Sequence, residues 1–150
     1  QGHEQITLKD EIDHVRQYLF IQKQRYGDKL QYEIEEDESI ADYKLPKRVL
    51  QPLVENAIYH GIKEIDRQGM IRVTSAAEEG QLILSIYDNG RGFDVNASID
   101  ATFLRLGGVG LKNVDQRLRL QFGDDYHMEI QSEPDKFTRI SLYLPLVTDD

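Results

Sequence analysis

Residues 70–87, MIRVTSAAEEGQLILSIY, decide the fold of this chain. Two apolar runs that are rich in β-branched residues, 70–74 and 81–87, lie on either side of the turn sequence Glu78-Glu79-Gly80. This pattern is typical of a β-hairpin. The second strand of the expected hairpin leads directly into Asp88, so the sequence predicts a carboxylate at the end of a strand.

The segment upstream of the hairpin predicts two helices and a strand. A helix is expected over residues 8–26, with Thr7 as its cap, Asp10 and Glu11 in its first turn, and apolar residues at helical spacing, namely Leu8, Ile12, Val15 and Leu19. Residues 30–35 alternate between apolar and polar, as a half-buried strand does. A second helix is expected over 46–62, but Pro52 lies within it. Either this helix begins later than Pro46, or its axis bends at Pro52.

The segment downstream predicts a loop, a helix and two strands. Residues 93–106 show no sustained period and are interpreted as a loop and a candidate lid. Residues 109–122 have the apolar spacing of a helix, and residues 127–132 and 137–144 are expected to be strands. Single helices between runs of strands favour an α+β fold. We expect a two-layer α/β sandwich in which helices cover one face of a mostly antiparallel, mixed sheet.

The composition limits the classes of function. The chain has 150 residues, enough for one domain, and carries 27 acidic against 18 basic residues, a net charge of -9. Such a surface should repel nucleic acid, so we expect no nucleic-acid partner. Cysteine is absent from the sequence, which excludes disulfides and thiolate zinc sites. An anionic ligand would need the positive ends of helix dipoles and a divalent cation.

One candidate ligand for such a cation is the amide of Asn56, in the segment LVENAIYHG at 53–61. Mg²⁺ prefers oxygen ligands and keeps several waters, so one side-chain carbonyl together with phosphate oxygens is sufficient. Glu55 precedes this residue, and His60 lies one helical turn after it on the same face, so both are candidates for supporting roles. The plain alternative is that Asn56 only bonds a neighbouring backbone group.

Two glycine segments complete the candidate site. In DNGRG at 88–92, Asp88 can accept a hydrogen bond from the exocyclic amine of adenine, at a position where guanine bears a carbonyl, while Gly90 and Gly92 let the backbone pass close to a flat ring. In GGVGL at 107–111, backbone amides before a helix can point at phosphates. A tight turn and a hinge are the respective alternatives. The order and complementarity of the three segments favour a nucleotide site.

These segments carry a family resemblance. Residues 55–61, 88–93 and 108–111 resemble the N, G1 and G2 boxes of the gyrase, heat-shock chaperone, histidine kinase and MutL (GHKL) ATPase superfamily. LQPLVENA at 50–57 and GLKNV at 110–114 are similar to the pattern of LytS-type bacterial sensor histidine kinases. The likeness extends upstream through residues 6–28 and so covers nearly the entire chain.

The resemblance implies a Bergerat-type site for ATP and Mg²⁺. It implies that Asn56 binds the metal and Asp88 the adenine amine, that Gly90 and Gly92 shape the base pocket, and that the second glycine box hinges a lid over the phosphates, through Gly108, Gly110 and Leu111. Thr138 matches a late threonine that supports adenine recognition, although the glycine that usually precedes it is replaced by Phe137. Many relatives have a lysine where this chain has Tyr59, and the candidates to replace its charge are Lys112, Arg105 and His60.

The resemblance also implies a function. It is that of the ATP-binding catalytic domain of a two-component sensor histidine kinase, which transfers the γ-phosphate to a histidine on an upstream segment, for relay to a response regulator. The family's acceptor motif is absent from this sequence, and Pro52 stands where gyrase-like members have a water-activating glutamate, so we expect low turnover in isolation. The alternative is a degenerate module that binds ATP and signals by shape alone.

The resemblance sets expectations for the whole protein as well. Residues 1–5 are interpreted as a tag or linker remnant, 6–29 as the end of a dimerisation helix with its linker, and 30–150 as the ATP-binding domain. The expected partners are the upstream dimerisation and phosphoacceptor segment of the same protein and a response regulator. The full-length protein is expected to be a homodimer, with this domain on the cytoplasmic side of a bacterial membrane.

Overall fold

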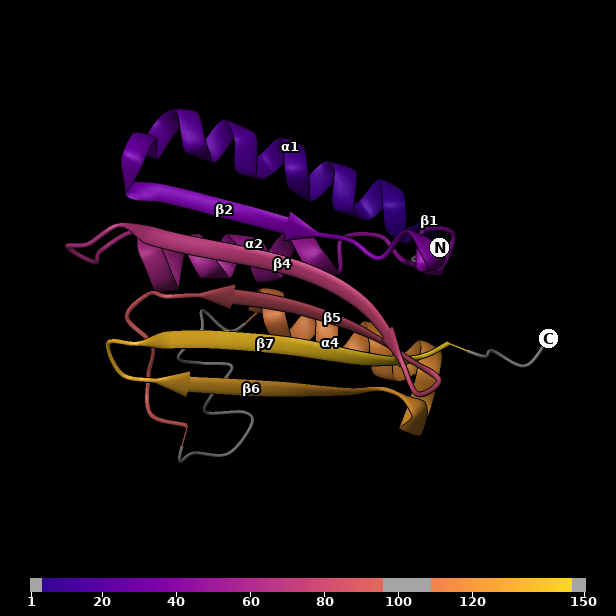
Figure 1. Ribbon diagram of the computed structural model, residues 1–150. Coiled ribbons are helices and arrows are strands. Elements are labelled where there is room, and N and C mark those ends of the chain that lie inside the picture. The colour runs from indigo at the N-terminus through magenta and orange to yellow at the C-terminus, as the bar shows by residue number, and fades with distance from the viewer. Residues whose placement is uncertain (1–3, 96–108, 147–150) are drawn as a thin grey trace.

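A computed structural model describes residues 4–95 and 109–146 of the chain (Figure 1). Its largest element is a five-stranded sheet with the order β2-β4-β5-β7-β6. The strands are β2 (Leu30–Glu35), β4 (Gly69–Glu78), β5 (Gln81–Asp88), β6 (His127–Glu133) and β7 (Phe137–Pro145). β2 and β4 pair in parallel and the other neighbours pair antiparallel. The sheet is therefore mixed and mostly antiparallel, as predicted, and the hairpin of residues 70–87 supplies two of its inner strands.

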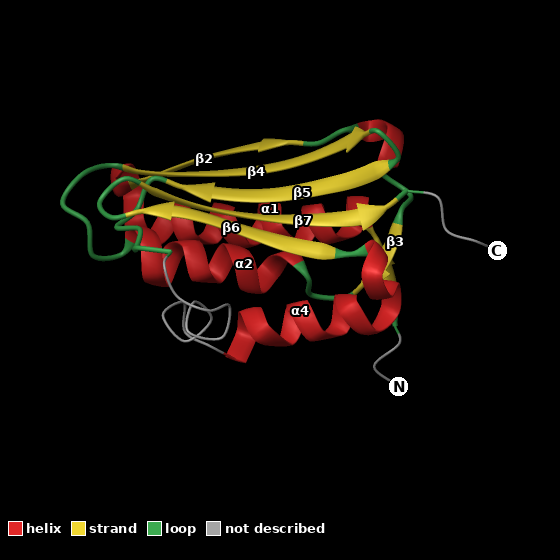
Figure 2. Cartoon of the chain, turned by 90° about the horizontal axis from the view of Figure 1, so that it is seen from below, coloured by secondary structure: helices red, strands yellow, loops and turns green. Residues whose placement is uncertain are grey.

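The α-helices lie together on one face of this sheet (Figure 2). They are α1 (Leu8–Tyr26), α2 (Leu50–Asn56) and α4 (Val109–Phe122), and α2 continues into the π-helical turn η3 (Ala57–Ile62). The core lies between the two layers, where buried residues of α1 such as Ile12 and Val15 pack in the same cluster as Val73 and Leu84 of the sheet. The predicted α+β sandwich with one helical layer is confirmed.

The expected helix over residues 46–62 begins later than Pro46. Residues Lys44–Pro46 form the short strand β3, which pairs antiparallel with β1 (Gln5–Thr7), and α2 starts at Leu50. Pro52 is then the third residue of the helix, within the first turn, where a backbone N–H has no acceptor inside the helix. The proline therefore removes no helical hydrogen bond, and its position is explained without a kink.

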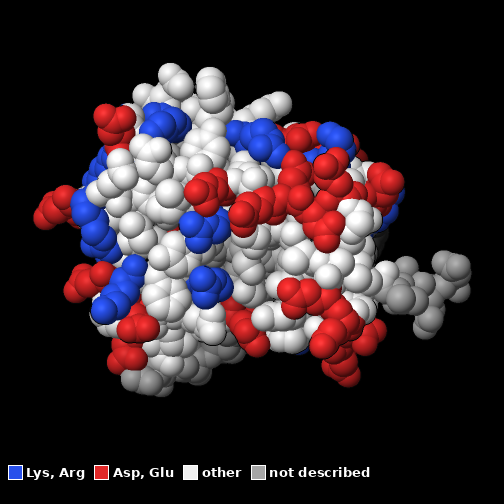
Figure 3. Space-filling model, viewed as in Figure 1, with Lys and Arg blue, Asp and Glu red and all other residues white. Residues whose placement is uncertain are grey.

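The second face of the sheet is open and carries polar and aromatic side chains. Alternate residues of β5 are fully buried, and those between them are partly exposed, because successive side chains of a strand point to opposite faces. Figure 3 shows acidic side chains predominating over the right-hand part of this face, with lysine and arginine interspersed among them on the left. Within the described ranges, no helix is long and apolar enough to cross a membrane.

Candidate functional site

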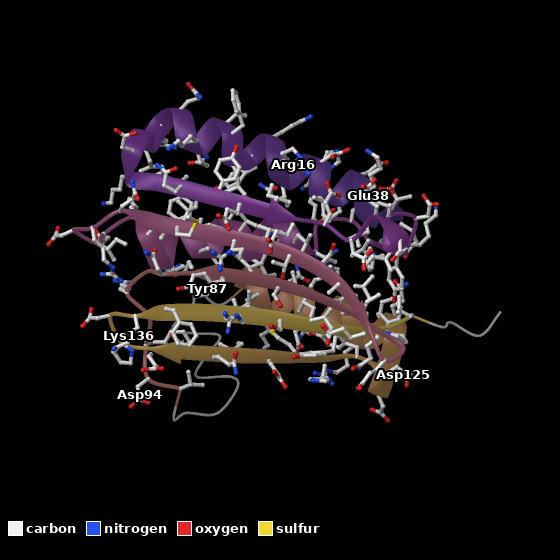
Figure 4. All side chains as sticks on the ribbon, in the orientation of Figure 1. Arg16, Glu38, Tyr87, Asp94, Asp125 and Lys136 are labelled. Carbon is white, nitrogen blue, oxygen red and sulfur yellow. The ribbon has the colours of Figure 1, made fainter. Side chains whose placement is uncertain are left out.

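Asp88, the last residue of β5, lies on the helix-covered side of the sheet. It continues the buried series of Leu82, Leu84 and Ile86. In the register between β5 and β7, Asp88 lies opposite Thr138, and only 3% and 4% of the two residues is exposed. Tyr87, one residue earlier, belongs to the open face instead (Figure 4), where its ring lies near the guanidinium of Arg139. The sheet thus places side by side the two residues that were predicted to contact a base.

The carboxyl of Asp88 is held by the turn that follows it. The backbone N–H of Gly90 donates to Oδ1 of Asp88 at 2.8 Å. Burial raises the pKa of Asp88 from 3.8 to about 7, and the Gly90 N–H opposes this rise only in part. A ligand amine that donates to this carboxyl would stabilise its ionised form and lower the pKa again. The group is therefore suited to recognise a hydrogen-bond donor away from bulk water.

The turn after β5 packs directly on the end of the η3 segment. A Cβ atom at Gly90 would lie 2.2 Å from the carbonyl oxygen of Gly61, and one at Gly61 would lie 2.4 Å from Oδ1 of Asp88. Arg91 closes the contact, because its N–H donates to the Gly61 carbonyl at 3.1 Å and its Nε to the His60 carbonyl at 3.0 Å. Only glycine fits at positions 61 and 90, so the backbones of two sequence motifs meet without intervening side chains.

Gly92 is constrained in a different way. Its φ is +57°, in the left-handed region, and a Cβ there would lie 2.0 Å from the carbonyl oxygen of Glu133. The next residue, Phe93, donates its N–H to Oγ of Ser132 at 2.9 Å. The same Oγ lies 2.8 Å from Oγ1 of Thr138. Ser132 therefore ties the segment after Asp88 to the threonine that faces it.

Arg67 fastens the same turn from another side. Its guanidinium donates to the carbonyl oxygens of Asn89 at 2.5 Å, Gly90 at 3.0 Å and Asp135 at 3.2 Å. The sequence analysis missed both Arg67 and Ser132. Neither residue belongs to a motif or a hydrophobic period, because each acts on backbone groups that are distant in sequence.

Asn56 forms the second end of the site. It is the last residue of α2, and 8% of it is exposed. Among the described residues, its Oδ1 is the one buried side-chain polar atom without a hydrogen-bond partner. A buried carbonyl oxygen without a partner costs about 1–3 kcal/mol, so its retention calls for a ligand. The donor set fits Mg²⁺, which takes oxygen ligands. The π-helical turn that follows is of a kind that occurs frequently at functional sites.

Asn56 opens into a cavity of about 190 Å³ between α2 and the start of α4. The cavity is lined by Pro52, Glu55, Asn56, Tyr59, His60, Gly110 and Leu111. The structure thus brings Asn56, Glu55 and His60 together with Gly110 and Leu111 of the second glycine box. Gly108 and the predicted lid from residue 96 onward lie outside the described residues.

The side chains around Asn56 differ in character. Glu55 accepts a hydrogen bond from Nε2 of Gln51 at 3.2 Å, and Tyr59 is half exposed beside the ammonium of Lys63, which lies 5.4 Å from the ring centre. Burial, and next the positive charge of Arg91, lower the pKa of His60 below 6.5. His60 is therefore neutral near pH 7, and it can bond a phosphate but contributes little charge to it.

The fold and the site define a class of protein: a nucleotide-binding domain of the ATPase type, in which helices cover one face of a mixed sheet. The chain belongs to the histidine kinase-, DNA gyrase B- and HSP90-like ATPase family, whose model matches residues 41–148. Residues 1–30 match a further family described as histidine kinase. The expected membership of the GHKL superfamily is confirmed.

Individual relatives agree with this assignment. The chain is 40% identical over 140 residues to the sensor histidine kinase BtsS of Escherichia coli strain K12, which covers 93% of this chain and 24% of BtsS. It is 31% identical over 146 residues to the sensor protein LytS of Bacillus subtilis strain 168, covering 94% of this chain and 25% of LytS. The likeness to LytS-type kinases is confirmed, and the chain spans about a quarter of the length of these relatives.

A solved structure agrees on the fold. The histidine kinase AdeS of Acinetobacter baumannii matches with a TM-score of 0.70 at 17% sequence identity, over 97% of this chain and 68% of that chain. At this identity the match establishes the architecture, not the ligand.

Proposed function

We propose that this chain binds ATP with Mg²⁺ and acts as the catalytic domain of a sensor histidine kinase. The γ-phosphate of the bound ATP would pass to a histidine on an upstream segment of the same protein, and from there to a response regulator. The proposal follows from family membership and from the similarity to sensor kinases over 93% of this chain. In the full-length protein, a homodimer in a bacterial membrane, the domain would face the cytoplasm.

The observation that carries the proposal is the unpaired, buried Oδ1 of Asn56. In the described part of the chain there is no cluster of three or more histidine, aspartate or glutamate residues that could hold a metal by itself. A single amide oxygen suits an ion that obtains its remaining ligands from phosphates and water. Mg²⁺ bound there would offset part of the negative charge of the triphosphate.

The opposite end of the site supports a choice of adenine. Asp88 and Thr138 face each other at the edge of the sheet, and Gly90 and Gly92 leave no side chain between the turn and its neighbours. A carboxylate accepts from the exocyclic amine of adenine, whereas guanine presents a carbonyl at that position, which cannot donate a hydrogen bond to the buried carboxyl. We propose that the base lies against Asp88 and the phosphates extend toward Asn56.

Transfer requires an acceptor that reaches the cavity of Asn56. A neutral imidazole nitrogen of that histidine would form a bond to the γ-phosphorus, while the bond from this phosphorus to the β–γ bridging oxygen breaks and ADP leaves with its electron pair. The proton on the other imidazole nitrogen then leaves to solvent. This chain contributes binding and orientation, which supply most of the catalysis in phosphoryl transfer.

Calorimetric titration of the chain with ATP, in Mg²⁺ and in EDTA, tests the binding. We expect Mg²⁺-dependent affinity that is lost in Asn56→Ala and kept in Gln17→Ala, a control that removes an exposed amide from α1. Absence of any adenine-nucleotide binding by the folded chain would refute the proposal. Addition of the upstream acceptor segment should then give phosphohistidine. Binding without transfer would instead favour the module that signals by shape.

A further inference from the structure

A buried carboxylate joins α1 to the helix that carries Asn56. Glu11 lies in the first turn of α1, and 2% of it is exposed. Its Oε2 accepts hydrogen bonds from the backbone N–H groups of Val49 at 2.8 Å and Leu50 at 2.9 Å, and its Oε1 accepts one from Arg48 at 3.2 Å. The N-terminal end of α2 therefore receives its cap from another helix.

This cap replaces one that α2 lacks. The residue at its N-terminal boundary is Val49, whose side chain makes no capping hydrogen bond. Free N–H groups at the start of a helix need an acceptor, and a carboxylate also interacts favourably with the positive end of the helix dipole. The sequence analysis placed Glu11 with the dipole of its own helix, α1, but its hydrogen bonds are to α2.

The same turn is held from the other side by α4. Arg117 donates from its two terminal nitrogens to the carbonyl oxygens of Lys47 at 2.5 Å and Arg48 at 2.6 Å. Arg48 has a φ of +60°, a left-handed conformation that is unfavourable for a residue other than glycine. Glu11 and Arg117 hold this turn together with Glu4, whose carbonyl oxygen accepts from the N–H of Lys47 at 3.4 Å. Strained backbone persists only where its surroundings fix it.

The clamp formed by Glu11, Arg117 and the turn Lys47–Arg48 joins α1 to two helices, α2 and α4, that line the cavity of Asn56. α2 ends at Asn56, and the first turn of α4 contains Gly110 and Leu111, which line the cavity of Asn56. α1 is tied to both through the clamp. Asp88 and Thr138 are held by strand pairing instead, so they do not depend on it.

We propose that Glu11 and Arg117 are positioning residues that couple the placement of α1 to the metal-binding end of the nucleotide site. The coupling rests on the proposed function. A shift of α1 relative to α2 withdraws the carboxylate, releases the turn, and displaces Asn56 and the cavity wall, while the base end stays in place. Regulation of this kind would act on Mg²⁺ and phosphate binding and leave base binding unchanged.

Glu11→Gln, which keeps the shape of the side chain and removes its charge, tests the coupling. Asp13→Asn is the matched control, because it removes a charge from the exposed side of the same helix. We expect Glu11→Gln to weaken binding of ATP with Mg²⁺ by about tenfold, a typical size for coupling between sites. Affinity for adenosine, which has no phosphate, should be unchanged, and both affinities should be unchanged in Asp13→Asn.

Arg117→Gln gives a second test that does not require Glu11→Gln to fold, with Arg119→Gln as its control on the same helix. As in Glu11→Gln, we expect the affinity for ATP with Mg²⁺ to fall and the affinity for adenosine to stay unchanged. Equal loss for both ligands, no loss for either, or unfolding of both variants would overturn the coupling, because the clamp would then serve the fold alone. If the wild-type chain binds neither ligand, the proposed function itself fails, and this outcome is distinct from the others.

Discussion

The candidate site has two ends that differ in how tightly they are packed: a base end around Asp88 and a metal end around Asn56. At the base end, backbone packs on backbone: Gly61, Gly90 and Gly92 leave no room for a Cβ atom, and the Asp88 carboxyl already has a hydrogen bond from Gly90. At the metal end, a buried amide oxygen of Asn56 has no partner within the described residues. Among the same residues, a Cβ atom at Gly110 would come near Pro52 alone, at 3.7 Å. The base end is complete without a ligand, whereas the metal end is not.

This difference indicates which end depends on the sheet and which on the helices. The base end lies at the paired ends of β5 and β7 and is tied further by Arg67 and Ser132. The metal end lies between α2 and α4 and keeps an unsatisfied group that costs about 1–3 kcal/mol. Substitutions at the base end should therefore lower stability first, and substitutions at the metal end should lower affinity first.

The largest effect is expected from adding one methyl group at the base end. Gly90→Ala would place its Cβ 2.2 Å from the Gly61 carbonyl, a backbone atom that cannot move aside cheaply. We expect a loss of about 3 kcal/mol in the free energy of unfolding, measured by urea denaturation, because overpacking of this kind costs up to about that much. Gly110→Ala, in a helix with space around it, should be neutral or slightly stabilising. Equal losses in the two variants would remove the contrast between the ends.

A pH-dependent effect of about 2 kcal/mol is expected from Asp88. Its pKa in the folded chain is raised by burial from 3.8 to about 7. The stability that its protonated form contributes is therefore fully present below pH 3.8, is lost progressively as the pH rises, and is gone above about pH 7. Between pH 5 and 7 the wild-type chain should lose about 2 kcal/mol relative to Asp88→Asn. Chemical denaturation of both proteins across this range measures the difference. Parallel pH profiles would show that the carboxyl ionises as readily as it does in the unfolded chain.

At the metal end, Asn56→Ala should lower the affinity for ATP with Mg²⁺ without lowering the stability of the fold. Removal of an unpaired buried acceptor should leave the free energy of unfolding unchanged or raise it by about 1 kcal/mol. Affinity for ATP with Mg²⁺ should fall at least about tenfold, the loss expected for one charge-assisted contact. Calorimetry and thermal denaturation of the same samples provide both values. A large loss of stability would mean that the amide has a structural partner and that the metal end is as self-contained as the base end.

Sequence periodicity predicted the longer helices and strands well. It predicted poorly the contacts between segments that are far apart in the sequence. The hairpin of residues 70–87 and the helices α1 and α4 follow from repeating apolar positions, which are local in sequence. β1 and β3 were missed because three residues are too few to show a period. The start of α2 was left open because Glu11, which caps it, is 37–39 residues away in the sequence.

The candidate site shows the same division. Asn56, Asp88 and the glycines carry motif signals, because the chemistry requires those residue types at fixed spacing. Arg67, Ser132 and Arg117 carry none, since each binds backbone groups of distant segments and another donor could do the same elsewhere. Their contribution follows only from the three-dimensional arrangement.

The smallest effect is expected at Tyr59, the position at which the family resemblance implies a lysine. Tyr59 lines the cavity of Asn56 and is 50% exposed. In Tyr59→Lys, an ammonium group near the phosphates should increase affinity for ATP with Mg²⁺ about threefold at low salt, in line with an exposed charge pair of about 0.2–1 kcal/mol. The gain should shrink at high salt because the group is exposed, and affinity for adenosine should not change. Leu120→Lys adds the same charge at an 83% exposed position of α4 and serves as the control. An equal gain in that control would mean that the effect comes from the net charge of -9 and not from position 59. A gain in affinity for adenosine would mean that position 59 contacts the base and therefore does not belong to the metal end.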